Sequence, residues 1–112
     1  VDQGTFSPTK IADGVKLDNH TQIGHNSDIG NGVILCGHAG TAGSVILGDF
    51  TVLGGYVAIG PGLELGAACK VGGGAKVLCD WPAKSKISGH PARPIKEWLR
   101  GIAWVRKESQ KK

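Results

Sequence analysis

Residues 22 to 35 read Gln22-Ile-Gly-His-Asn-Ser-Asp-Ile-Gly-Asn-Gly-Val-Ile-Leu35, and they carry the signal that decides the fold. An aliphatic residue recurs there at every sixth position, and the same step continues in both directions along the chain. The twelve residues at this step are Ile11, Leu17, Ile23, Ile29, Leu35, Thr41, Leu47, Leu53, Ile59, Leu65, Val71 and Val77. All of them except Thr41 are aliphatic, and glycine directly follows seven of the twelve. The chain is therefore built from an internal repeat.

A period of six matches neither the period of an α-helix nor the alternation of an ordinary strand. It fits a short strand with two inward side chains and a turn, because the residue four positions after each aliphatic one is mostly small or β-branched. Three such units close a triangular coil of about 18 residues, and coils stack about 4.8 Å apart. The hexads, which are clear from 11 to 82, predict an all-β fold: a parallel β-helix of about four coils. The alternative is chance spacing in a chain with 19 glycines.

The hexad pattern stops after Trp81, and a loop rich in proline and glycine follows. From Ile95 onward, apolar residues recur at helical spacing with lysine and arginine on the other side. We predict a basic amphipathic helix that caps the end of the solenoid or packs against a neighbouring subunit. The predicted division is a β-helix domain over 1–88 and a helical extension over 89–112.

Composition narrows the class of protein. The three cysteines form no CxxC pair, which favours reduced thiols in a cytosol-like compartment over disulfides or a thiolate metal site. No apolar run is long enough to span a membrane, and no signal peptide is visible. Residues 1–82 carry a net charge of −3 and residues 83–112 carry +7. We therefore expect an acidic partner at the C-terminal end and no nucleic-acid partner.

Stacking converts sequence distance into position, because residues one coil period apart lie one above the other. His20 and His38 are one such period apart and share one corner of the coil. His25 lies at the next corner, where Gly43 stacks on it. Each of these histidines could simply be a solvated turn side chain.

The stretch Leu17-Asp-Asn-His-Thr-Gln-Ile-Gly-His-Asn26 resembles the catalytic segment of the bacterial UDP-3-O-acylglucosamine N-acyltransferases, which act in lipid A synthesis. Only His20 is unusual in it. The resemblance covers nearly the whole chain; it continues through Ala42-Gly43-Ser44, Gly48-Asp49, Gly54-Gly55 and the tail Ser88-Gly-His-Pro-Ala-Arg-Pro-Ile-Lys-Glu-Trp98. It implies a left-handed β-helix, a cytoplasmic enzyme without cofactor or metal, and a homotrimer with active sites between subunits.

The resemblance also implies roles for particular residues. His25 would be the general base that takes a proton from the 2-amino group of the sugar, since imidazole titrates near neutral pH. The backbone N–H of Gly43 would stabilise the oxyanion. Asp18 would support the imidazole or bind the incoming amine, and Asn26 would bind substrate. Gly43, Asp18 and Asn26 each also have a simpler interpretation as turn residues.

The acyl donor in this family is a 3-hydroxyacyl chain on acyl carrier protein, an acidic partner. The basic tail is a candidate docking surface, with Arg93, Lys96 and Arg100 as candidate contacts; the alternative is a solvated helix face. Two departures from the family pattern stand out, since Gly62 replaces a second histidine and Cys79 replaces a basic residue. We expect the family's N-terminal nucleotide-binding domain to be absent from this chain, which leaves open whether the chain is active alone.

Other classes remain open from the sequence. A γ-class carbonic anhydrase is also a left-handed β-helix, and its zinc histidines include a pair with the spacing of His20 and His25. The register of the pair differs by one position, and Ser7 stands where a third zinc ligand would lie. Hexapeptide-repeat acyltransferases that act on other sugars, serine or antibiotics are the closer alternative. A non-catalytic trimerisation module is the third.

Overall fold

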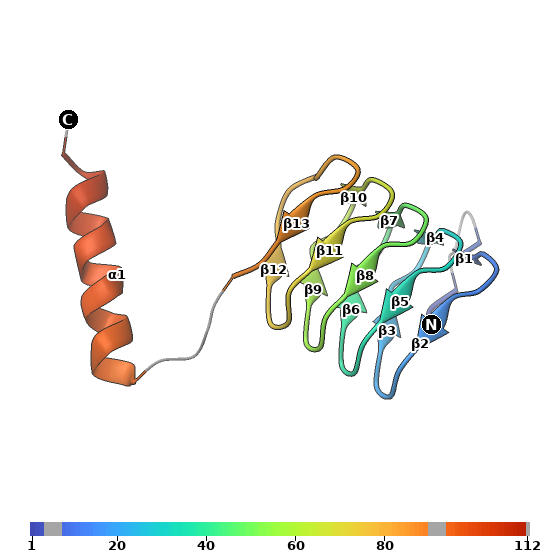
Figure 1. The fold of residues 1–112 in the computed structure, drawn as a ribbon, viewed down its shortest axis with the longest axis horizontal. Helices are drawn as coiled ribbons and strands as arrows, with labels where there is room; N and C mark the ends of the chain where they lie inside the picture. The colour runs from blue at the N-terminus through green and yellow to red at the C-terminus, as the bar shows by residue number, and fades with distance from the viewer. Residues whose placement is uncertain (4–7, 90–93, 112) are drawn as a thin grey trace.

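The structure is a computed structural model that describes residues 1–3, 8–89 and 94–111. Within these ranges the chain forms thirteen strands of two residues each, followed by one helix. The strands wind into a solenoid with three flat sides, and the helix follows it at the C-terminal end (Figure 1). The predicted parallel β-helix with a C-terminal helix is confirmed.

Each side of the solenoid is a parallel sheet. Sheet A contains β1 (Lys10–Ile11), β4 (Asp28–Ile29), β7 (Ile46–Leu47) and β10 (Glu64–Leu65). Sheet B contains β2 (Lys16–Leu17), β5 (Ile34–Leu35), β8 (Val52–Leu53), β11 (Lys70–Val71) and β13 (Lys86–Ile87). Sheet C contains β3 (Gln22–Ile23), β6 (Gly40–Thr41), β9 (Ala58–Ile59) and β12 (Lys76–Val77). We name the turns between them corner AB, corner BC and corner CA.

The core is a narrow column inside the three sheets. The second residue of each strand from β3 to β12 is buried, as the hexad register predicts. The register holds over these coils because each strand pairs with the equivalent strand of the next coil, as Ile29 does with Leu47. Ile11 and Leu17 occupy core positions of the first coil and are nevertheless 41% and 39% exposed, because the described residues form no complete coil before them.

The last coil is shorter than the others. Leu65 pairs with Trp81, and Val71 pairs with Ile87, so the partners are two positions closer in the chain than in the earlier coils. Strand pairing therefore continues through β13, although the sequence repeat stops after Trp81. β13 lies within the predicted β-helix domain of residues 1–88, but the sequence pattern predicts a loop after Trp81; the shortened coil hides this strand from a search with a period of six.

The C-terminal helix, α1 (Ile95–Ser109), forms where the apolar spacing predicts it. None of its residues is buried, and in Figure 1 it lies beyond the last coil without packing on the strands. Capping of the solenoid by this helix is therefore not observed. Trp98, Leu99 and Ile102 are at least 42% exposed, which leaves the apolar face of α1 available to a partner.

Candidate functional site at corner CA

The three corners carry different chemistry on the same backbone. At corner AB, side chains of one coil accept hydrogen bonds from turn N–H groups of the coil before it: Asp49 Oδ1 accepts from Asn31 N at 2.8 Å, and Asn31 Oδ1 accepts from Asp13 N at 3.1 Å. At corner BC, aromatic side chains stack in one column. Corner CA carries His25 and, one and two coils later, Gly43 and Pro61. Neither residue above His25 offers a side-chain acceptor.

The imidazole of His25 is exposed at corner CA, between β3 and β4. Its Nδ1 lies 2.9 Å from Oδ1 of Asn26. An amide oxygen accepts hydrogen bonds and cannot donate them, so Nδ1 carries the ring proton in this arrangement. In the neutral imidazole Nε2 then keeps its lone pair, which is the state that a general base needs.

Asn26 holds this arrangement through its backbone conformation. Its φ is +59°, in the left-handed region that asparagine tolerates better than most residues. Its backbone N–H donates to Oγ1 of Thr9 at 3.0 Å. The predicted substrate-binding residue is thus also the residue that orients the imidazole of His25.

Gly43 lies against the imidazole, as stacking predicts. A Cβ added at Gly43 would come within 2.5 Å of Cε1 of His25 and closer still to Nε2, so the ring occupies the space that a side chain would fill. The carbonyl of Gly43 accepts from Gly62 N at 3.0 Å. Its N–H makes no hydrogen bond within the described ranges. The imidazole thus lies against a residue whose backbone N–H is unpaired among the described residues, and proton transfer and oxyanion stabilisation need one group of each kind.

Asp18 is not brought to His25 within one chain. It begins corner BC, on the far side of β3, and its Oδ1 accepts from Asn19 N at 2.8 Å. The other carboxylate oxygen faces Gly37 of the next coil, 3.7 Å from the position of an added Cβ. The predicted support of the imidazole by Asp18 would need a group that bridges two corners.

The other two histidines of the described solenoid form a stacked column. The rings of His20 and His38 have centroids 4.8 Å apart, and Tyr56 continues the stack at 4.6 Å from His38. The column lies at corner BC, so His20 and His25 occupy different corners. The part of the chain that the structure describes contains no group of three or more metal-ligating side chains. The zinc-enzyme alternative is therefore not supported.

The candidate docking residues divide between described and undescribed parts of the chain. Lys96 and Arg100 lie one turn apart on α1, and both are exposed. Arg93 lies outside the described residues. Gly62 is exposed with φ +69°. A Cβ there would meet nothing within 4 Å, but a side chain would have to adopt a strained backbone conformation.

Two residues that take part in these corners were not predicted from the sequence, Tyr56 in the stacked column and Thr9 beside Asn26. Tyr56 lies one coil period after His38, as His38 does after His20, so extending the same spacing would have identified it. Thr9 lies before the first clear hexad, so the repeat does not identify it. Its hydrogen bond with Asn26 is seen only in the structure.

The chain matches no family model. It is 50% identical over 105 residues to a UDP-3-O-acylglucosamine N-acyltransferase of Caulobacter vibrioides, a match that covers 94% of this chain and 31% of that protein. A protein of the same name from another Caulobacter strain is 35% identical over 109 residues, covering 97% and 32%. A probable mitochondrial one from Arabidopsis thaliana is 37% identical over 102 residues, covering 91% and 34%. The chain thus spans about a third of the length of these curated relatives.

Solved structures agree on the fold. A serine acetyltransferase from Entamoeba histolytica, solved with cysteine, superposes with a TM-score of 0.57 at 19% identity, covering 83% of this chain and 41% of that one. A histidine-to-alanine variant of GDP-perosamine N-acetyltransferase from Caulobacter crescentus, solved with CoA and GDP-perosamine, has a TM-score of 0.51 at 25% identity, covering 76% and 52%. The fold class is the predicted left-handed parallel β-helix.

Of the helices in the described ranges, none is long and apolar enough to cross a membrane. Similarity to the Caulobacter and Arabidopsis proteins runs along more than nine-tenths of the chain. Along most of its length, the chain is thus similar to the C-terminal part of proteins named UDP-3-O-acylglucosamine N-acyltransferase.

Proposed function

We propose that this chain carries the catalytic turn of an N-acyltransferase that moves a 3-hydroxyacyl group from acyl carrier protein to the 2-amino group of UDP-3-O-acylglucosamine, a step of lipid A biosynthesis. The observation that supports it most is the pairing of His25 and Gly43. In the neutral ring, the bond from Nδ1 to Asn26 leaves the lone pair on Nε2, and the ring lies against a glycine whose N–H has no partner within the described ranges.

The chemistry follows from these two groups. The amine attacks the thioester carbonyl while Nε2 of His25 takes its proton, and a C–N bond forms. The carbonyl oxygen becomes an oxyanion, which accepts a hydrogen bond from Gly43 N–H. The C–S bond then breaks, and the thiolate takes the proton back from the imidazolium. The amide and the free thiol of the carrier are the products.

Binding residues are assigned as follows. Asn26 orients the imidazole and can contact the sugar with its amide nitrogen. Asp18 would bind substrate only where a substrate spans corners CA and BC. The exposed basic residues Lys96 and Arg100 of α1, with Arg93, would bind the acidic surface of acyl carrier protein, and charge complementarity there would mainly raise the association rate.

We further propose a homotrimer that works in the cytoplasm. Two features support an assembly: the apolar face of α1 is uncovered by described residues, and the imidazole of His25 is exposed at an open corner of the solenoid. Equilibrium sedimentation of the full-length protein should give three times the mass of one chain. A strictly monomeric protein would contradict the assembly.

A hexapeptide-repeat acyltransferase with another substrate is the second candidate. The likeness to GDP-perosamine N-acetyltransferase favours it, because that protein's name also describes acyl transfer to an amine of a nucleotide-linked sugar. The two candidate functions differ in the acyl donor that they use. Mass spectrometry of the product should show transfer from 3-hydroxyacyl carrier protein to UDP-3-O-acylglucosamine. Transfer from an acyl-CoA alone would favour the second candidate.

His25→Ala tests the proposed base. We expect the turnover number of the full-length protein to fall by at least about 100-fold, because the proton acceptor is lost. His38→Ala is the matched control, since it removes a turn imidazole at a different corner. Equal activity of the two variants would remove His25 from the base role.

A further inference from the structure

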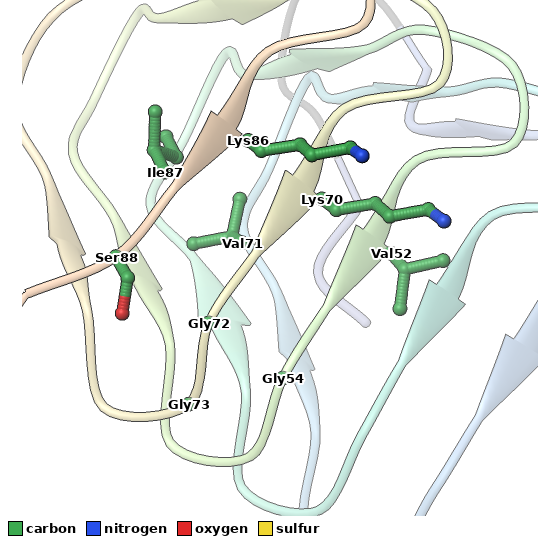
Figure 2. Close-up of a pocket in the computed structure, with 9 residues that line it drawn as sticks. All are labelled: Val52, Gly54, Lys70, Val71, Gly72, Gly73, Lys86, Ile87 and Ser88. Carbon is green, nitrogen blue, oxygen red and sulfur yellow. The ribbon is translucent and has the colours of Figure 1, made fainter.

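The end of the solenoid has a hollow that the proposed reaction does not use. It has a volume of about 650 Å³ and lies along sheet B and the last turn of corner BC (Figure 2). It exists because β13 is the last strand, so no described turn stacks on residues 72–75. Ser88 lies over Gly72, where a Cβ on the glycine would come 2.6 Å from its Oγ.

Two lysines stand side by side at this hollow. Lys70 of β11 and Lys86 of β13 are in register on neighbouring parallel strands, and Figure 2 shows their side chains extended in the same direction. Like charges directly opposite each other on a sheet repel. Neither lysine has an ion pair within the described ranges, and no carboxylate lines the hollow. Their charges are therefore available to an anionic ligand.

The remaining lining groups lie apart from the two ammonium groups. Ser88 Oγ and the N–H of Gly73 make no hydrogen bond to any described residue, and both lysine side chains extend away from them (Figure 2). Val52 lies beside Lys70 on the same face of the sheet (Figure 2). A ligand that fits has an anionic group with several acceptor oxygens next to an apolar part. A phosphate ester has both parts, since its phosphate is anionic and its ester group can be apolar. Lysine ammonium groups bind phosphate as point charges.

We propose that Lys70 and Lys86, which are in register at the edge of this hollow, bind a phosphate group of a substrate. The source depends on the proposed function: it is the phosphodiester of the carrier protein's prosthetic arm or the diphosphate of the nucleotide-linked sugar. Both present phosphate oxygens next to less polar atoms. Binding of phosphate itself does not depend on that function.

The direct test uses inorganic pyrophosphate and titration calorimetry. The protein should bind pyrophosphate saturably, with an affinity that falls as salt rises. Lys70→Gln with Lys86→Gln should weaken binding by at least about tenfold. Lys16→Gln is the matched control, because Lys16 lies on the outer face of the same sheet at its far end. Unsaturable binding, or an equal loss in the control, would overturn the site.

Kinetics of the full-length protein identify the source. If the double variant raises KM only for acyl carrier protein, the lysines bind the phosphate of the donor. If it raises KM only for the nucleotide-linked sugar, they bind the diphosphate of the acceptor. Unchanged KM for both would overturn the substrate role. If the protein shows no acyl transfer at all, the proposed function fails while pyrophosphate binding still decides the phosphate site.

Discussion

Corner AB and corner CA have the same turn geometry and opposite polar chemistry. At corner AB the N–H of Asn31 is capped from the coil above by Asp49. At corner CA the equivalent position above Gly43 is Pro61, which has no side-chain acceptor, and the N–H of Gly43 stays without a partner within the described ranges. A backbone donor that is left unpaired on a surface can bind a ligand. The comparison teaches that the same turn has a capped N–H where the next coil supplies a side-chain acceptor and an open N–H where it does not; only an open N–H can serve the proposed oxyanion role.

The largest effect is expected from filling the space beside the imidazole. In Gly43→Ala the new Cβ would overlap the His25 ring and displace it from Asn26. Because a displacement of about 1 Å can cost about 100-fold in rate, we expect a loss of that order. The ring is exposed, so chemical denaturation should show little change in the free energy of unfolding. A variant with full activity would show that the contact has no catalytic meaning.

Asn26 separates orientation of the imidazole from strain in the turn. Both Asn26→Gly and Asn26→Ala lose the bond to Nδ1, and we expect turnover to fall about tenfold in each. Alanine must also adopt φ near +59°, which costs about 1 kcal/mol that glycine avoids. Parallel measurements of rate and melting temperature check this. Loss of activity in the alanine variant alone would mean that the turn conformation matters and the hydrogen bond does not.

Asp49→Ala is the converse test at corner AB. It uncaps the N–H of Asn31, so the free energy of unfolding should fall by about 1 kcal/mol. Acyl transfer should stay within about twofold of the parent, because corner AB has no part in the proposed chemistry. Urea denaturation and a steady-state assay on the same preparation measure both. A large loss of activity without loss of stability would reverse the roles of the two corners.

The fold could be predicted from the sequence almost entirely, because the hexad period records which side chains fill the core. Thr41, the one non-aliphatic member of the series, is buried with its Oγ1 accepting from Gly24 N at 3.2 Å, so a polar side chain is accommodated by a hydrogen bond. β13 could not be predicted because its coil is shorter than the repeat. The apolar spacing predicts α1 itself, but capping of the solenoid by this helix is not observed among the described residues (Figure 1).

The candidate site could be predicted in part. Stacking by one coil period places Gly43 on His25, and the structure shows that contact. The contact between His25 and Asn26 depends on the left-handed φ of Asn26, which sequence spacing does not reveal. Proximity of Asp18 to His25 is not observed within the chain, because a whole strand separates them and leads to another corner.

The most direct test of the central claim converts corner CA into a copy of corner AB. Pro61→Asn places an amide acceptor one coil after Gly43, as Asn31 is placed after Asp13. The new Oδ1 should accept from Gly43 N–H and remove the proposed oxyanion donor. Single-turnover acyl transfer in the full-length protein should then slow by about 100-fold or more, with stability unchanged or slightly raised. A rate equal to that of the parent would contradict the claim that the open N–H at corner CA performs the chemistry.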